Sequence, residues 1–223
     1  MIIAAVPVKD LVNAKQRLVR LLTPGERSEL ARAMLGDVLR ALGAAALDRV
    51  WVVTREPAVA TIARSLGAEP LDEAENRGHT AAVAHAQAAA VERGASVFIT
   101  VPGDVPCVTA DEIRSLAAAA SGSRAAIFTP SRSGLGTNGV ALTPPDAMRL
   151  RFGEPSFDNH LAAARALGLA PRVLSLPGLA LDVDAPDDLA ALLEHGPGTA
   201  TRRLLGAWRL PERLASAGAV RSR

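Results

Sequence analysis

The sequence predicts a single α/β domain in which a mostly parallel central sheet is flanked by helices. Short apolar runs typical of buried strands alternate with segments of helical periodicity along most of the 223 residues. Loops containing proline, glycine and charged residues follow several of these runs, and ligands of open α/β sheets bind at the carboxyl ends of strands. A chain of this length can bury one sizeable core.

The first half of the chain supplies a strand that we expect to be central, followed by two more. Thr23 and Glu26 form a capping box with Pro24 at the first helical position, so a long helix begins there. Gly67 closes a second helix. The expected strands are residues 2–8, 50–54 and 68–71, and the second helix covers residues 57–66.

In the second half, an alanine-rich helix follows Gly78, and a buried strand from residue 97 then leads into a loop containing Asp104. Thr109 and Glu112 form another capping box at the start of the next helix. The remaining expected elements are helix 110–120, strands 125–130 and 139–143, helix 156–167, strand 172–176, and a helix whose first turn contains Asp187 and Asp188.

The basic character of the chain is concentrated in its last segment. The sequence has 25 lysines and arginines against 23 acidic residues, and residues 202–223 hold six arginines but one glutamate. We therefore predict a folded domain at residues 1–206 and an arginine-rich C-terminal tail, free to be flexible, at residues 207–223. A solvated terminus explains this tail better than a nucleic-acid contact, so no nucleic-acid partner is expected.

The cysteine content and the hydropathy pattern bear on where in the cell the protein is located. Cys107 is the one cysteine, which excludes an internal disulfide framework and fits a reducing compartment. No apolar run is long enough to cross a bilayer, and the start MIIAAVPVKD has no basic region before its apolar stretch, unlike a signal peptide. We expect a cytoplasmic protein with no membrane partner.

Asp104 is the first candidate functional residue because it follows a buried strand through the loop VPGDVP. A carboxylate in this place is often a helix N-cap or a turn residue. The next helix, however, already has its own capping box at Thr109, which leaves Asp104 available. A hard divalent cation is the usual ligand of a loop carboxylate near phosphates.

A basic loop follows the first strand and contains Lys9, Lys15 and Arg17. The chain otherwise uses arginine, and these two lysines are its only ones. Their compact ammonium groups indicate phosphate contacts, although chance use of lysine is an alternative. No glycine-rich phosphate loop of standard spacing is present, so side chains would have to bind the phosphates.

Further polar residues lie where strands end or helices begin. Asp182 and Asp184 are two apart, so on an extended segment both carboxylates point the same way and need a cation or an arginine between them. Thr137 with Asn138 could hydrogen-bond an anionic ligand. The other candidates are Gly78 and Thr80 at a helix N-terminus that attracts anions, Gly153 in a turn, and Ser156, which a plain N-cap explains equally well.

Taken together, these segments resemble the CofC/FbiD family. The segments PVKDLVNAKQRL, VPGDVP, GTN, RFGEPS and LDVDAPDDL occur here in the family's order, and the resemblance covers residues 1–195. It implies a Rossmann-like nucleotidyltransferase of the GT-A type. It also implies a guanylyltransferase that activates a small phosphorylated acid in the biosynthesis of the deazaflavin coenzyme F420.

The resemblance also implies a role for each candidate residue. Three groups are expected: Asp104, Asp182 and Asp184 as ligands of Mg²⁺; Thr137, Gly153 and Ser156 as contacts of the phosphorylated acid; and Lys9, Lys15 and Arg17, which with Asp104 form the catalytic set, near the triphosphate. Gly78 and Thr80 are the expected nucleotide contacts. Here the chain departs from the family, because Gly78-His79-Thr80 stands where relatives often have Gly-Leu-Asn.

In the reaction implied, an ionised phosphate oxygen of the acid attacks the α-phosphorus of GTP and pyrophosphate leaves. The acceptor is 2-phospho-L-lactate or phosphoenolpyruvate, with 3-phospho-D-glycerate as the alternative. The expected partners are GTP, the acid and a downstream transferase that accepts the unstable product, and a homodimer is left open. Two other interpretations stay open: another GT-A-like transferase acting on a sugar phosphate or molybdopterin precursor, and a non-catalytic nucleotide-binding protein.

Overall fold

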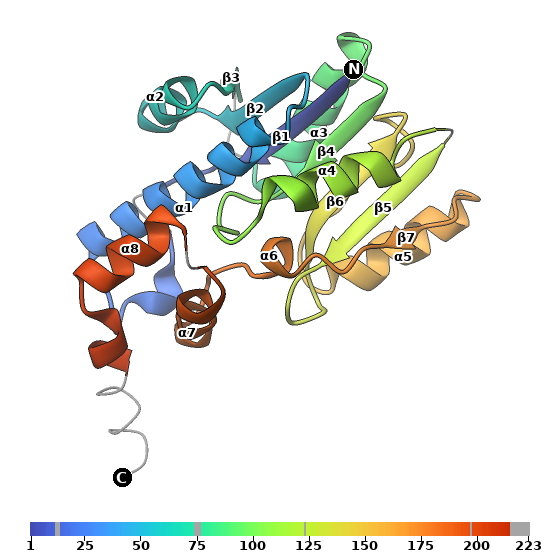
Figure 1. Ribbon diagram of the computed structural model, residues 1–223. Helices are drawn as coiled ribbons and strands as arrows, with labels where there is room; N and C mark the ends of the chain where they lie inside the picture. The colour runs from blue at the N-terminus through green and yellow to red at the C-terminus, as the bar shows by residue number, and fades with distance from the viewer. Residues whose placement is uncertain (12–13, 74–76, 123, 197, 215–223) are drawn as a thin grey trace.

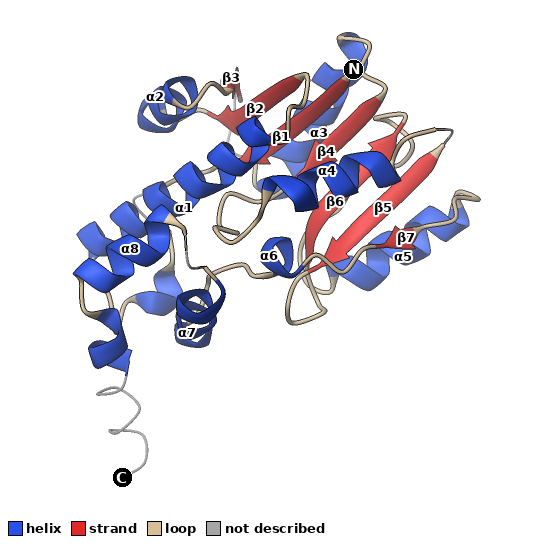
Figure 2. Cartoon of the chain, viewed as in Figure 1, coloured by secondary structure: helices blue, strands red, loops and turns tan. Residues whose placement is uncertain are grey.

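A seven-stranded sheet forms the centre of the molecule in the computed structural model, which describes residues 1–11, 14–73, 77–122, 124–196 and 198–214. Within these ranges the strand order is β3-β2-β1-β4-β6-β5-β7 (Figures 1 and 2). The strands are β1 (Ile2–Pro7), β2 (Arg49–Thr54), β3 (Glu69–Asp72), β4 (Val97–Thr100), β5 (Ala125–Pro130), β6 (Thr137–Thr143) and β7 (Arg172–Val173).

The sheet is mostly parallel, as the sequence predicts. β1 pairs in parallel with β2 and β4, β2 with β3, and β5 with β7, whereas β6 runs antiparallel to both β4 and β5. Thr100 at the end of β4 pairs with Val140 near the start of β6. The beginning of β6 therefore lies at the same edge as the carboxyl ends of β1 and β4, which brings Thr137 to that edge.

Each predicted helix begins where the sequence places it. Both predicted capping boxes are present: the Thr23 hydroxyl accepts from the Glu26 amide, and the Thr109 hydroxyl accepts from the Glu112 amide. The helices are η1 (Gln16–Leu18), α1 (Pro24–Ala44), α2 (Pro57–Ser65), α3 (His79–Glu92), α4 (Ala110–Ala119), α5 (Ser156–Ala166), α6 (Pro177–Ala180), α7 (Pro186–His195) and α8 (Ala200–Ala207). The short helices η1 and α6 and the C-terminal α8 were not predicted.

Helices cover both faces of the sheet, and alternation along the strands separates two cores. In β1, Ala4 and Val6 face one core, which contains residues of α1, α2, α4, α7 and α8. Ile3 and Ala5 face the other, formed with α3 and α5. Figure 1 shows α1 and α4 in front of the sheet and α3 and α5 behind it. This layering leaves the sheet edge where β1 and β4 end open to ligands.

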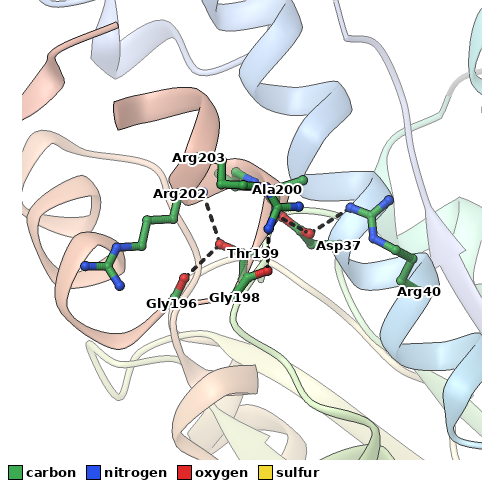
Figure 3. Close-up of polar contacts among 9 residues, drawn as sticks. Asp37, Arg40, Gly196, Gly198, Thr199, Ala200, Arg202 and Arg203 are labelled. Carbon is green, nitrogen blue, oxygen red and sulfur yellow. Dashed lines mark hydrogen bonds and ion pairs between the residues drawn. The ribbon is translucent and has the colours of Figure 1, made fainter. Parts of the chain in front are cut away.

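Helix α8 is fastened to α1 through the buried carboxylate of Asp37 (Figure 3). The Asp37 oxygens accept from the backbone amides of Ala200 and Thr201 at 2.9 and 2.8 Å, and from the Thr201 hydroxyl at 2.6 Å. Arg40 donates to the same carboxylate at 2.7 Å. Asp37 thus satisfies the free amides at the start of α8, where the helix dipole also favours a negative charge.

The packed structure continues past α8. Leu210 is fully buried, and Arg213 forms an ion pair with Glu26 at 2.7 Å. Residues 207–214 of the predicted tail therefore contact the domain, while residues 215–223 lie outside the described residues. Across the ranges that the structure describes, no helix has both the length and the apolar character needed to span a membrane.

Candidate active site

The predicted site residues lie on loops and helix ends at one edge of the sheet. Lys9 and Lys15 follow β1, Asp104 follows β4, Thr137 begins β6, and Asp184 lies between α6 and α7. These segments are far apart in the sequence, and the parallel pairing of β1 with β4 together with the reversed direction of β6 brings them to this edge.

Lys15 lies between two of the predicted metal ligands. Its Nζ is 2.5 Å from Oδ2 of Asp104 and 2.8 Å from Oδ1 of Asp184. The Lys15 side chain is 6% exposed, against 31% for Asp104 and 47% for Asp184. Burial by itself would lower the pKa of Lys15, but the charges of both carboxylates outweigh it and raise that pKa. Lys15 is therefore a buried, charged ammonium held by two carboxylates.

Asp182 has a different environment from Asp184. The Nδ2 of Asn138 donates to Oδ1 of Asp182 at 3.0 Å and also to the carbonyl oxygens of Leu179 and Ala180. Asn138, which was expected to contact an anion, instead holds Asp182 and the end of α6 in place. Burial raises the pKa of Asp182, and the charges of Asp104 and Asp184 add to that increase against the Asn138 hydrogen bond.

The three carboxylates at this edge are of the chemical type that binds a divalent cation. Mg²⁺ prefers oxygen ligands, and three carboxylates that affect one another electrostatically would gain from an added cation. Within the described residues no three acidic, histidine or cysteine side chains are already gathered around one point as metal ligands. Instead, the ammonium of Lys15 lies between the carboxylates of Asp104 and Asp184.

Two cavities meet at the end of β1. One, of about 220 Å³, is lined by Lys9, Lys15, Gly103 and Asp104 together with apolar residues of α1. The other, of about 100 Å³, is lined by Gly78 and His79 at the start of α3 and by Val53 and Glu73. Both share Pro7, Val8 and Lys9 as lining residues. The two cavities are therefore neighbours, and together they reach from the two lysines to the N-terminus of α3.

A third cavity, of about 330 Å³, is lined by Asp182 and Asp184 instead of Asp104 and is strongly polar. It is lined by Arg17, Arg132, Ser133, Glu154, Asp182, Asp184 and Asp188. The sequence grouped Arg17 with Lys9 and Lys15, but the structure places Arg17 in this separate cavity. Arg132 was not predicted. It comes from the loop between β5 and β6, and its guanidinium contacts Asp188 at 2.8 Å.

The hydroxyl groups of Thr137 and Ser156 form a hydrogen-bond network with His160, a residue that was not selected from the sequence. Nδ1 of His160 is 3.0 Å from Oγ1 of Thr137, and the Ser156 hydroxyl donates to the same oxygen at 3.3 Å. The backbone amide of Arg151 donates to Nε2 of His160 at 3.0 Å, so Nε2 is unprotonated and Nδ1 carries the hydrogen. Burial lowers the pKa of His160 to about 4. Its position four residues after Ser156 on α5, on the same helix face, was the signal available in the sequence.

This network leaves one hydrogen available. Oγ1 of Thr137 accepts from both His160 and Ser156, which uses its two lone pairs. Among the described residues no acceptor takes the hydroxyl hydrogen of Thr137, so it can be donated to a ligand. Ser156 is the first residue of α5 and Pro155 is the N-cap, so the N-cap explanation of Ser156 is wrong.

Gly78, Thr80 and Gly153 complete the predicted set. Gly78 is the N-cap of α3 with φ 93°, and Gly153 has φ 119°, both in the region that glycine favours. The hydroxyl of Thr80 accepts from the Phe152 amide at 2.9 Å and so joins α3 to the segment before α5. The Phe152 ring meets His79 and His160 edge to face, at centroid distances of 4.5 and 5.1 Å.

The arrangement can bind two anionic groups on either side of one carboxylate cluster. Lysine ammonium groups on the first side are suited to phosphates, while Arg17 and Arg132 line the cavity on the second and can bind a carboxylate or a phosphate. No histidine or cysteine nucleophile is needed, and Cys107 is buried with a pKa raised to about 11, mainly by burial. The site is therefore suited to positioning and charge neutralisation.

Comparison with known proteins identifies the family. The family model described as "Guanylyl transferase CofC like" matches residues 2–222. A phosphoenolpyruvate guanylyltransferase of Rubrobacter xylanophilus is 40% identical over 195 residues, covering 87% of this chain and 95% of that protein. A 2-phospho-L-lactate guanylyltransferase of Methanothermobacter thermautotrophicus is 38% identical over 202 residues, covering 91% of this chain and 88% of that protein.

Solved structures agree with the fold. A nucleotidyl transferase from Methanothermobacter, Mth528, matches with a TM-score of 0.66 at 17% identity, covering 87% of this chain and 97% of that chain. A Mycobacterium tuberculosis protein, Rv0371C, solved as a manganese complex, matches with a TM-score of 0.56 at 20% identity, covering 86% and 98%. The chain belongs to the guanylyl transferase CofC-like family, has the nucleotidyltransferase fold and is a nucleotidyltransferase.

Proposed function

We propose that this member of the CofC family transfers GMP from GTP to the phosphate of a small phosphorylated carboxylic acid and releases pyrophosphate, in coenzyme F420 biosynthesis. The observation that carries this proposal is the carboxylate cluster of Asp104, Asp182 and Asp184 between a lysine-lined cavity and an arginine-lined cavity. Two anionic substrates that react with each other need such an arrangement.

The nucleotide side of the site is proposed to be the two neighbouring cavities that reach from Lys15 to the N-terminus of α3. Lys9 and Lys15 would bind the triphosphate, and the amides at the start of α3, next to Gly78, would attract its negative charge or hydrogen-bond the nucleoside. Thr80 contributes through its bond to Phe152, which fixes this helix end.

The acceptor side is proposed to lie at Thr137, Gly153 and Ser156, next to the cavity lined by Arg17 and Arg132. The Thr137 hydroxyl would donate to the acid, since His160 and Ser156 both donate to its oxygen. Arg17 and Arg132 would offset the charges of the acid's carboxylate and phosphate. This assigns Arg17 to the acceptor instead of the triphosphate.

Asp104, Asp182 and Asp184 would hold a divalent cation, with Mg²⁺ as the proposed ion. When bound, the cation supplies charge neutralisation for the phosphoryl oxygens and for the pyrophosphate leaving group. A phosphate oxygen of the acid is ionised at neutral pH, so no side chain has to remove a proton. The protein's residues therefore act by aligning that oxygen with the α-phosphorus and by excluding other geometries.

Phosphoenolpyruvate is the acceptor that we favour, because the relatives at 40–42% identity are named phosphoenolpyruvate guanylyltransferases. 2-Phospho-L-lactate is the second candidate, since the relative at 38% identity carries that name. 3-Phospho-D-glycerate, a downstream transferase that takes the product, a homodimer and a cytoplasmic location stay predictions.

The test is pyrophosphate release from GTP with Mg²⁺, with each of the three acids offered separately. ATP in place of GTP serves as the nucleotide control. Strong release with GTP and phosphoenolpyruvate alone would support the proposal in full, and release with another acid would correct the acceptor. A folded protein that binds GTP but releases no pyrophosphate with any of the three would contradict it.

A further inference from the structure

We propose that Lys15 occupies the cation site before the substrates bind, and that its ammonium moves from Asp104 and Asp184 to the nucleotide phosphates when GTP and the divalent cation arrive. This inference rests on the proposed role of the aspartates as the metal site. It adds a step that the proposed function does not contain, namely an exchange of one cation for another at the same two carboxylates.

The contact distances support competition between the two cations. Nζ of Lys15 lies 2.5 Å from an oxygen of Asp104 and 2.8 Å from an oxygen of Asp184. An ion bound by the same two oxygens would stand within a few ångströms of the ammonium, and like charges at that separation repel strongly in a partly buried site. Metal ligation by both carboxylates therefore requires Lys15 to leave.

The backbone of Lys15 adds a second observation. Lys15 has φ 57° and ψ 44°, the left-handed conformation, which costs about 1 kcal/mol or more for a residue with a side chain. The neighbouring helix η1 begins directly after it. The two ion pairs can hold this conformation, so its cost would favour a change at Lys15 once those pairs are released.

The cavity next to the two ion pairs of Lys15 provides space for the ammonium after it leaves the carboxylates. Lys15 and Asp104 both line the cavity of about 220 Å³, together with Lys9. A rotation of the Lys15 side chain within this cavity would take Nζ away from the carboxylates and toward the proposed position of the triphosphate. The nucleotide phosphates would replace the charge partners that Lys15 loses, so the move leaves no buried ammonium unpaired.

The exchange has a thermodynamic consequence. Metal binding to the protein alone must displace an ammonium that is already paired, whereas metal binding beside a nucleotide meets carboxylates that Lys15 has left. Metal and nucleotide therefore bind cooperatively, beyond the chelation of the metal by GTP itself. A protein that works this way keeps its carboxylates neutralised between turnovers.

The test measures Mn²⁺ binding to the nucleotide-free protein by electron paramagnetic resonance, for the wild type and for Lys15→Met. The variant keeps most of the stem and removes the competing charge, so its Mn²⁺ affinity should be about 10- to 100-fold tighter than that of the wild type. Lys9→Met is the matched control, since Lys9 lines the same cavity, and its Mn²⁺ affinity should stay near that of the wild type. Lys15→Met/Asp184→Asn should lose the gain.

The outcomes separate this inference from the proposed function. Equal or weaker Mn²⁺ binding by folded Lys15→Met overturns the exchange, while the aspartates remain a metal site. If neither the wild type nor the variant binds Mn²⁺, even with GTP present, the metal site in the proposed function fails as well, and the exchange fails with it.

A measurement on the wild-type chain covers the case in which Lys15→Met does not fold. The chain has only two lysines, so labelling with ¹³Cε-lysine gives two Cε signals, one each for Lys9 and Lys15. Adding Mg²⁺ with a non-hydrolysable GTP analogue should shift the Lys15 signal strongly, since its carboxylate partners are replaced. A Lys15 signal that stays in place at saturation overturns the exchange.

Discussion

Two carboxylate networks in this protein use the same chemistry for opposite purposes. Asp37 accepts from two backbone amides, one hydroxyl and Arg40, and it fastens α8 to α1 (Figure 3). Asp104 and Asp184 share the ammonium of Lys15. Backbone amides cannot leave without unfolding the helix, whereas a lysine at the end of a flexible stem can. The difference indicates that Asp37 serves the fold, whereas the partner of Asp104 and Asp184 can leave them available for the proposed metal site.

The Thr137 network combines both features within the proposed active site. His160 is fixed by the backbone amide of Arg151, as Asp37 is fixed by α8, but it leaves the hydroxyl hydrogen of Thr137 for a ligand. The proposed acceptor side is therefore preorganised by neutral hydrogen bonds, whereas the proposed nucleotide side contains charged groups that can exchange partners. Four substitutions test this comparison.

Asp104→Asn should have the largest effect on activity. The variant keeps the shape of the side chain and removes one charge from the proposed metal site, so we expect turnover to fall by about a thousandfold or more. The variant should still fold, because Asp184 and the new amide oxygen can accept from Lys15 and the backbone carbonyl at position 104 still accepts from the Val183 amide. The melting temperature should fall modestly, since a buried ammonium loses one charge partner. Steady-state pyrophosphate release measures the loss, with the exposed Asp111→Asn as the control. Activity near that of the wild type would remove Asp104 from the mechanism.

Asp37→Ala should lower the stability of the protein and leave its activity unchanged. Removing this carboxylate leaves the amides of Ala200 and Thr201 without a partner in a buried position, at a cost of about 3 kcal/mol in the free energy of unfolding. Urea denaturation measures the loss. Because Asp37 lies outside the site, kcat/KM of the protein that remains folded should be unchanged. A large loss of kcat without loss of stability would contradict the structural role assigned to Asp37.

His160→Phe tests the Thr137 network through the pH dependence of the protein's stability. Burial lowers the pKa of His160 to about 4, against its ordinary value of 6.5, so the unfolded chain binds more protons between those values. Stability of the wild type should therefore fall as the pH drops from 6.5, by about 2 kcal/mol at pH 5 from this residue alone.

His160→Phe should lack that part of the pH dependence, which urea denaturation at pH 7 and pH 5 measures. Its KM for the acceptor acid should also rise roughly tenfold, because Thr137 loses a donor that orients its hydroxyl. His85→Phe, at an exposed position on α3, is the control. Identical pH profiles for wild type and His160→Phe would contradict the assignment of the buried neutral histidine.

Arg132→Ala should have the smallest effect of the four. Arg132 is half exposed and already contacts Asp188, so its contribution to acceptor binding is screened. We expect KM for the acid to rise by about fivefold, with KM for GTP unchanged. Arg114→Ala, which removes another exposed, ion-paired arginine, is the control. A rise in KM for GTP instead would move Arg132 to the nucleotide side.

Much of the fold was determined by the sequence alone. Strands followed from short apolar runs, and the starts of α1 and α4 followed from the capping boxes at Thr23 and Thr109, because these signals are local in the chain. Asp104 was recognised for the same reason, since a neighbouring capping box left it without a structural role. Local patterns did not predict the short helix α6. They predicted a strand at residues 172–176, but β7 covers only Arg172–Val173, because the length of an edge strand depends on packing.

The partners of the site residues were decided only by the tertiary structure. The sequence grouped Arg17 with Lys9 and Lys15 because the three are close in the chain, yet the structure places Arg17 in a different cavity. From the sequence alone, Lys15 could not be paired with Asp184, nor His160 with Thr137, because those contacts join residues 169 and 23 positions apart. Residue type fixes which chemistry a side chain can offer, whereas sheet order and strand direction fix which other side chain it meets.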